Sequence, residues 1–160
     1  MAARALCGLI MLAVALTACS APPRESVAAS NSGLGDAPAP SAVPAQVVDE
    51  ANFLSPSGNI GCYLDTSGAR CDIVRKTWQP PPAPADCDLD WGSGVAVHKA
   101  EEASFTCAGD TVLGAKDKLA YGDALRAGDF LCTSDSTAIS CSNTVSGHGF
   151  ALAREQYELF

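Results

Sequence analysis

The chain has 160 residues and a formal net charge of −8, from 18 acidic and 10 basic side chains. The basic residues are scattered and form no run, which excludes the phosphate backbone of a nucleic acid as a partner. The length allows one small domain behind an N-terminal segment of different composition.

The first predicted element is a signal peptide at residues 1–18. Its apolar run, ALCGLIMLAVAL at residues 5–16, is uncharged and shorter than the roughly 20 residues that a helix needs to span a bilayer. The next residues, Leu16-Thr17-Ala18-Cys19, resemble the bacterial lipobox, in which the cysteine thiol is acylated. Two acyl chains anchor a protein stably. We therefore expect Cys19 to hold the chain at the outer face of the cell membrane; a plain signal peptide containing a cysteine is the alternative.

Residues 20–46 form a linker by composition. Of these 27 residues, 19 are Pro, Ala, Ser or Gly, and the apolar residues show no period. Such a segment buries too little surface to offset the entropy lost on ordering, so we expect disorder. Together with Cys19 it makes a predicted tether at residues 19–46, with a packed N-terminal arm as the alternative. Residues 47–160 are then a single domain.

Six cysteines remain for this domain. The chain has eight, but Cys7 lies in the predicted signal peptide and Cys19 in the lipobox. An even number in a small exported domain is typical of a disulfide framework, which compensates for a modest core. Zinc is the alternative, but no Cys-x-x-Cys occurs and the spacings fit no common zinc site. The six are Cys62, Cys71, Cys87, Cys107, Cys132 and Cys141.

Two cysteine pairs with the same spacing predict two hairpins. Eight residues separate Cys62 from Cys71, and eight separate Cys132 from Cys141. Because side chains alternate along a strand, a hairpin that turns at Asp65–Gly68 places Cys62 opposite Cys71 on the apolar face. Directly opposed strand residues are close enough for a disulfide. We therefore predict one disulfide within each hairpin.

The two hairpins also share a sequence pattern. GNIGC at residues 58–62 and GDFLC at residues 128–132 both read as Gly, Asn or Asp, a large apolar residue, any residue and Cys. This similarity indicates a hairpin used twice and suggests an internal duplication. Cys87 and Cys107 then pair by elimination.

The stretches between turn signals are short and rich in β-forming residues. Glycine and proline punctuate them, most densely at Gln79–Pro84, which favours an all-β antiparallel sandwich or open barrel. Lys116–Arg126 and Arg154–Tyr157 are ambiguous, and each suits a helical turn. The predicted strands are Ile60–Leu64, Ala69–Val74, Val95–His98, Ser104–Cys107, Phe130–Thr133, Ile139–Ser142 and Phe150–Ala153.

Several motifs are shared with a known kind of domain. FLSPSGNIGCYL at residues 53–64, CDLDWG at 87–92, FTCAGDTVL at 105–113 and GHGFALAREQYELF at 147–160 resemble an uncharacterised domain family of secreted proteins and lipoproteins of actinobacteria. The resemblance covers nearly all of residues 53–160. It implies a small cysteine-bridged extracytoplasmic domain and brings no activity, because none is assigned to that family.

Ser146 and His148 are weak catalytic candidates. A serine nucleophile needs a base within hydrogen-bond reach and a third group that orients the base, for which Asp135 is available. No Gly-x-Ser-x-Gly turn supports a hydrolase, and Gly147 and Gly149 predict a tight turn instead. A small envelope hydrolase is therefore the alternative, and a non-enzymatic protein is the expectation.

Asp86, Asp88 and Asp90 are weak metal candidates. They alternate as at the start of a calcium loop, but that loop needs glycine and glutamate where Trp91 and Val97 stand. We interpret the three carboxylates as solvated and expect neither a metal nor a cofactor.

Trp78 and Trp91 flank the proline-rich stretch. We expect both indoles to pack against the sheet with a polar edge exposed. A tryptophan beside a proline-rich run also suits the wall of a ligand groove, so the two residues are candidates for binding.

Together these features favour a lipid-anchored, non-enzymatic envelope protein that binds or presents a partner outside the membrane. Residues 47–160 carry 16 acidic and 8 basic side chains, which favours a basic envelope protein as that partner. A purely structural lipoprotein is a further alternative.

Overall fold

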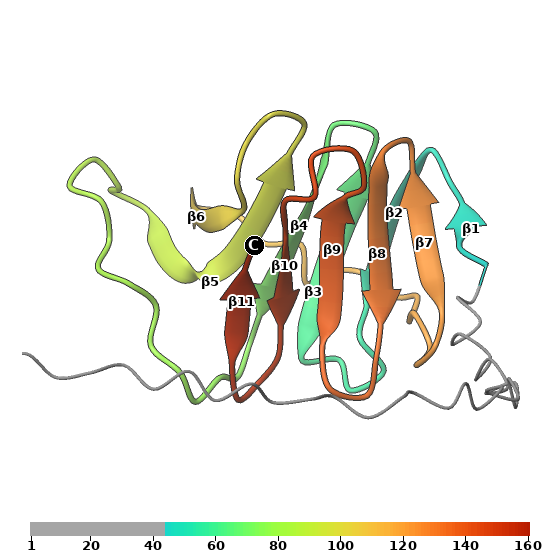
Figure 1. Ribbon diagram of the computed structural model, residues 1–160. Coiled ribbons are helices and arrows are strands. Elements are labelled where there is room, and N and C mark those ends of the chain that lie inside the picture. Colours follow the sequence, from blue (N-terminus) through green and yellow to red (C-terminus); the bar gives the residue numbers. More distant parts are fainter. Residues whose placement is uncertain (1–43) are drawn as a thin grey trace, which may run out of the picture. The chain divides into compact units, whose positions relative to one another are not determined.

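The computed structural model describes residues 44–160 (Figure 1). The predicted signal peptide, Cys19 and most of the predicted tether lie outside these residues. The described part consists of strands and connections and contains no helix. β1 (Gln46–Val47) spans the predicted boundary between tether and domain.

Two five-stranded antiparallel meanders face each other as a sandwich, and no closed barrel forms. In both, strands adjacent in sequence pair with one another. The all-β prediction is confirmed, and β1 extends the second sheet by pairing parallel to β7. The first meander comprises β2 (Glu50–Leu54), β3 (Ile60–Asp65), β4 (Gly68–Ile73), β5 (Asp90–His98) and β6 (Ser104–Ala108); the second comprises β7 (Ala124–Ala127), β8 (Phe130–Ser134), β9 (Ile139–Asn143), β10 (Gly149–Leu152) and β11 (Tyr157–Leu159).

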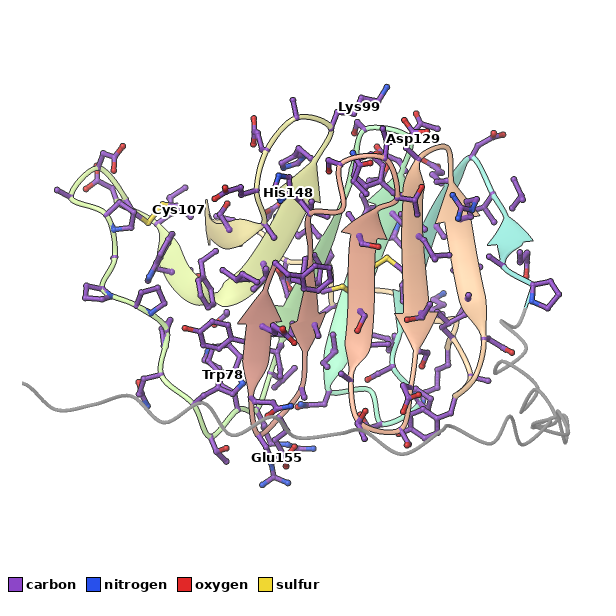
Figure 2. The ribbon with its side chains drawn as sticks, in the orientation of Figure 1. Trp78, Lys99, Cys107, Asp129, His148 and Glu155 are labelled. Carbon is purple, nitrogen blue, oxygen red and sulfur yellow. A yellow bond between two sulfur atoms is a disulfide. The ribbon has the colours of Figure 1, made fainter. Side chains whose placement is uncertain are left out.

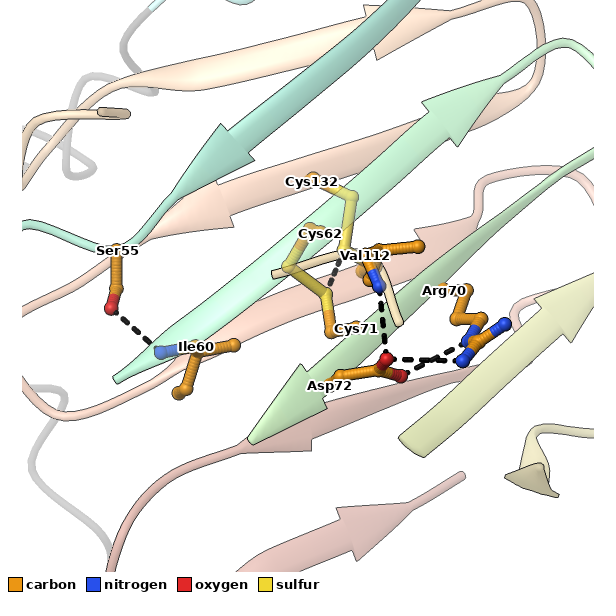
Figure 3. The surroundings of a disulfide bond; sticks show 9 residues. Ser55, Ile60, Cys62, Arg70, Cys71, Asp72, Val112 and Cys132 are labelled. Atoms are coloured by element: carbon orange, nitrogen blue, oxygen red, sulfur yellow. Dashed lines mark hydrogen bonds and ion pairs between the residues drawn. A yellow bond between two sulfur atoms is a disulfide. The ribbon is translucent and has the colours of Figure 1, made fainter. Parts of the chain in front are cut away.

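A disulfide joins the two strands of the second hairpin of each meander. Cys62 lies opposite Cys71 in β3–β4, and Cys132 lies opposite Cys141 in β8–β9. The four sulfurs are fully buried, and the Sγ atoms of Cys71 and Cys141 are 3.8 Å apart, so the two bridges stack between the sheets (Figure 3). The hairpin pairing agrees with the prediction from spacing. Cys87–Cys107 forms the third bridge.

An equivalent row of four core residues crosses each meander. The strand before each bridge and the strand after it contribute one apolar side chain at the register of the bridge. This repetition supports the internal duplication that the sequence indicates. The two rows are Phe53, Cys62, Cys71 and Val95 in the first meander, and Leu125, Cys132, Cys141 and Phe150 in the second.

Strands that hold the same position in the two meanders, such as β3 and β8, run in opposite directions. Each end of the sandwich therefore carries connections from both meanders. Ile60 at the start of β3 and Ile139 at the start of β9 line one pocket at the lower end of Figure 1. At the upper end, Asn143 at the end of β9 donates to the carbonyl of Lys99 after β5 (3.1 Å). The lower end therefore carries the β2–β3, β4–β5, β8–β9 and β10–β11 connections. The upper end carries the other four turns within the meanders.

The connection from β6 to β7 crosses the outer face of the first sheet. The backbone N–H of Val112 donates to buried Asp72 (3.0 Å), which also binds Arg70 on its own strand (Figure 3). Farther along, Leu54 of β2 donates to Asp117 (2.8 Å) and accepts from Leu119 (3.0 Å). These bonds fasten the connection across the sheet and onto its edge.

This crossing corrects one expectation. The helical turn expected at Lys116–Arg126 is wrong, because this stretch forms an isolated bridge from Lys118 to Leu54 and then enters β7. An exposed strand edge offers hydrogen-bond partners that a local helical turn would forgo. The second helical turn, expected at Arg154–Tyr157, is also wrong: this stretch turns between β10 and β11, and Tyr157 begins β11.

The β4–β5 connection, residues 74–89, extends to the side of the sandwich opposite β1 (Figure 1). The Cys87–Cys107 bridge ties it to β6, and the indole N–H of Trp91 donates to the carbonyl of Pro81 (2.8 Å). Pro80 lies directly over Gly92, whose φ of 81° and lack of a side chain permit this approach. The proline-rich stretch is therefore held at several points.

Candidate functional site

Ser146 and His148 lie in the β9–β10 turn, where the predicted tight turn is present. The Oδ1 atom of buried Asn143 accepts the backbone N–H groups of Val145 (2.9 Å) and Ser146 (3.3 Å). The hydroxyl of Ser146 accepts the backbone N–H of His148 (3.3 Å). Within residues 44–160, no hydrogen bond joins this hydroxyl to the imidazole, and none joins the imidazole to a carboxylate. The turn holds the backbone and leaves both side chains without a catalytic partner.

Asp135, the third member of the imagined triad, lies at the other end of the sandwich. β9 separates the β8–β9 turn from the β9–β10 turn, and its five residues span about 16 Å at ~3.3 Å each. Asp135 instead accepts hydrogen bonds from Ser136 and Thr137 of its own turn. The structure does not bring the three residues together.

Asp86, Asp88 and Asp90 are exposed and follow the proline-rich stretch. In the described part of the chain, the His, Cys, Asp and Glu side chains close enough together to bind one metal ion are Cys62, Cys71 and Cys141, and none of the three aspartates is among them. Those cysteines are already bonded as disulfides. The three aspartates are therefore not gathered around a common point.

Trp78 and Trp91 both pack into an aromatic cluster. Their ring centroids lie 6.0 and 5.8 Å from that of Phe105, and Trp78 lies 4.7 Å from Tyr157. The indole N–H of Trp78 donates to the carbonyl of Ala153 (2.9 Å). Both indoles thus satisfy their polar edge on backbone carbonyls while their rings cover the core. Their part in a ligand groove stays a prediction.

The upper end gathers negative charge. Figure 2 labels Lys99, Asp129 and His148 there, and Trp78 and Glu155 toward the lower end. Within residues 44–160, six carboxylates lie in or next to the connections of the upper end, and the cationic residues Lys99 and Arg126 lie there too. We call this group the acidic end; its carboxylates are Asp49, Glu50, Asp65, Glu101, Glu102 and Asp129.

Local contacts show the effect of this charge. Tyr63 donates its hydroxyl to Glu50 (3.0 Å), and this hydrogen bond, with burial and the nearby charges of Glu50 and Asp65, raises the pKa of Tyr63. Asp65 accepts the backbone N–H groups of Ser67 (2.7 Å) and Gly68 (3.0 Å), which fixes its turn. The carboxylates therefore stand on connections whose shape is set by hydrogen bonds.

Asn143 organises the acidic end from inside. It is 2% exposed and binds two N–H groups of the β9–β10 turn and the carbonyl of Lys99 in the β5–β6 connection. The turn it holds presents Val145, which is 77% exposed. Val145 is therefore an exposed apolar side chain on a turn whose backbone is held by hydrogen bonds to Asn143.

Sequence reasoning missed Asn143 and its counterpart at the lower end, Asn59. Both are buried amides that pair with backbone groups of another connection, and Asn59 binds Arg75 through both amide atoms. Asn59 is part of GNIGC, which resembles GDFLC in the second meander, and this repetition is a sequence signal by which Asn59 could have been identified. Asn143 has no such signal, because its partner Lys99 is distant in sequence.

Comparisons with known proteins identify a family, whose description names no activity. No helix in the described range has the length and apolarity to cross a membrane. No curated protein and no solved structure matches the chain. A family model matches residues 36–160, which include both meanders and all three disulfides. The chain belongs to the family of unknown function DUF6636.

Proposed function

We propose that this protein is a lipid-anchored, non-enzymatic binding module of the cell envelope, whose acidic end takes a basic protein partner. The observation that carries the proposal is the acidic end itself: six carboxylates lie in or beside the connections of one end of the sandwich, where the turn held by Asn143 also exposes Val145. Complementary charge speeds association and selects partners, and a fixed surface loses little entropy on binding.

Location supports the proposal. The three disulfides indicate an oxidising, extracytoplasmic environment. β1 pairs parallel to β7 at the edge of the second sheet, so the chain joins the sandwich at this edge and runs toward the acidic end (Figure 1). The resemblance to domains of actinobacterial secreted proteins and lipoproteins favours the same location.

The anchor rests on Leu16–Cys19, which lie outside the described residues. We expect the wild-type protein to fractionate with membranes and to carry acyl chains on Cys19, as measured by mass spectrometry of the intact protein. Cys19→Ala should shift it into the soluble fraction, because one thioether-linked attachment point supplies the membrane affinity. A Cys19→Ala protein that stays with membranes and resists high salt would refute the anchor.

The binding role can be tested with cationic proteins of known surface. We expect the Cys19→Ala protein to bind lysozyme at low salt and to lose affinity steeply as salt is added. Changing Glu101, Glu102 and Asp129 to their amides should weaken binding at least about tenfold, because each removes an unscreened attraction. Surface plasmon resonance gives both the affinity and its salt dependence.

A variant with the same net charge serves as the control. Asp86→Asn, Asp88→Asn and Glu155→Gln remove three exposed charges outside the acidic end and should leave the affinity within about twofold. Equal losses in both triple variants would show attraction by net charge alone and would overturn the assignment to this end. Absence of any binding to lysozyme and to a second cationic protein, cytochrome c, would overturn the proposal.

A further inference from the structure

The lower end carries a polar pocket that none of the candidates above explains. Its volume is about 240 Å³, below the roughly 300–1,000 Å³ of pockets for drug-sized ligands. Connections from both meanders form it, so it exists only where the sheets meet. Its chemistry comes chiefly from Ser57, Arg75, Tyr121, Thr137, Arg154 and Glu155, together with Asp135.

Arg75 and Arg154 are positioned by their backbones. The amide of buried Asn59 accepts the N–H of Arg75 and donates to its carbonyl, both at 2.9 Å. The carbonyl of Arg154 accepts the backbone N–H of Thr77 (2.9 Å) and its hydroxyl (3.3 Å). Neither guanidinium makes an ion pair or a hydrogen bond with residues 44–160, although this is a chain of net charge −8. Two unpaired guanidinium groups at one pocket suit an oxyanion, which arginine binds in a bidentate manner.

The same pocket holds acceptors for hydroxyl groups. The Oδ1 atom of Asp135 accepts the N–H of Thr137 (3.2 Å) and the hydroxyls of Ser136 (3.1 Å) and Thr137 (3.3 Å). These bonds, that of the Thr137 N–H foremost, lower the pKa of Asp135, so the carboxylate is ionised at neutral pH. Its Oδ2 atom and the carboxylate of Glu155 are acceptors that a ligand hydroxyl can reach.

An aromatic ring completes the pocket. Tyr121 lines it and is 53% exposed, unlike the packed rings of the Trp78 cluster. An exposed ring offers a flat apolar face beside a polar tip. A pocket with guanidinium groups, carboxylates, hydroxyls and one open ring matches a small molecule that has an oxyanion, several hydroxyls and an apolar face.

We propose that this pocket binds a single acidic sugar residue. The oxyanion of the sugar, a carboxylate or a phosphate, pairs with Arg75 and Arg154. Sugar hydroxyls donate to Asp135 and Glu155, and the C–H face of the ring packs on Tyr121. The module then has a saccharide site at its lower end, separate from the acidic end at the other.

NMR titration of the Cys19→Ala chain tests the site with three probes: glucuronate, glucose 6-phosphate and neutral glucose. An acidic sugar at tens of millimolar should shift the backbone amide signals of Arg75, Thr137 and Arg154 in a saturable manner, whereas glucose should not. The stronger of the two acids identifies the carboxylate or the phosphate as the recognised group.

Substitutions at the two arginines check that the pocket is responsible. Arg75→Gln and Arg154→Gln should each weaken binding about tenfold, since each removes charge-assisted hydrogen bonds. Arg126→Gln is the matched control, because Arg126 binds Thr144 at the acidic end, and it should have no effect. Three results would each overturn the saccharide site: equal shifts with glucose, no response to either acidic sugar, or unchanged affinity in both arginine variants. None of these results bears on lysozyme binding at the acidic end.

Discussion

The two meanders share a core and differ in their connections. In both, an apolar residue on each neighbouring strand lies at the register of the disulfide. The connection that follows the disulfide-bonded hairpin differs in length: β4–β5 covers residues 74–89, whereas β9–β10 covers only 144–148. The longer connection has no strand ladder of its own. It is held by the third disulfide, by two indole N–H bonds and by close packing on Gly92. A repeated core thus accepts an extended connection when separate cross-links hold it.

The same comparison explains why the two ends of the sandwich are chemically distinct. Arg75 and Val145 each lie four residues after the second cysteine of their hairpin, and the backbone N–H of each donates to a buried asparagine. One position carries a guanidinium at the pocket, and the other an exposed apolar side chain at the acidic end. Equivalent backbone positions in the two meanders therefore present different chemistry at opposite ends.

Removing the core disulfides is expected to have the largest effect and tests the equivalence of the meanders. Replacing Cys62 and Cys71 with alanine, or Cys132 and Cys141, should lower the free energy of unfolding by about 2.5 kcal/mol from ring closure. Lost packing of the stacked sulfurs adds to this in both cases. Urea denaturation followed by tryptophan fluorescence gives the two values, which should agree within about 1 kcal/mol.

The third disulfide provides the contrast. Replacing Cys87 and Cys107 should release the proline-rich connection, with faster hydrogen exchange confined to it and to β6, because this bridge lies outside the stacked core. If instead the Cys87/Cys107 variant destabilised the whole sandwich while one core variant left it intact, the picture of two equivalent cores with one attached connection would fail.

The buried asparagines should give a smaller effect, confined to one end each. Asn59→Ala and Asn143→Ala each leave backbone groups unpaired and should cost about 1–3 kcal/mol. Hydrogen exchange should rise at Arg75 in the first variant and at Val145 and Ser146 in the second. Exposed Asn52→Ala is the control and should be nearly neutral. Faster exchange at both ends in either variant would show that the ends are coupled.

The local features of the fold follow from short stretches of sequence. Alternation of apolar residues and a turn at Asp65–Gly68 placed Cys62 opposite Cys71, because a hairpin closes over a few residues and its register follows from the turn. The seven predicted strands all correspond to strands of the structure. β2 went unpredicted because EANFL lacks a clear alternation, and it is a strand because β3 offers it a partner.

Which distant residues meet depends on the packing of the two sheets. The 3.8 Å contact of Cys71 with Cys141, and the pocket between Arg75 and Arg154, depend on how two sheets stack face to face. Asp135 and Ser146 are close in sequence, yet the length of β9 separates them, so the two side chains lie at opposite ends of the sandwich. Local periodicity sets a strand and its turn, whereas the packing of two sheets is a choice among many faces and registers that no short stretch of sequence encodes.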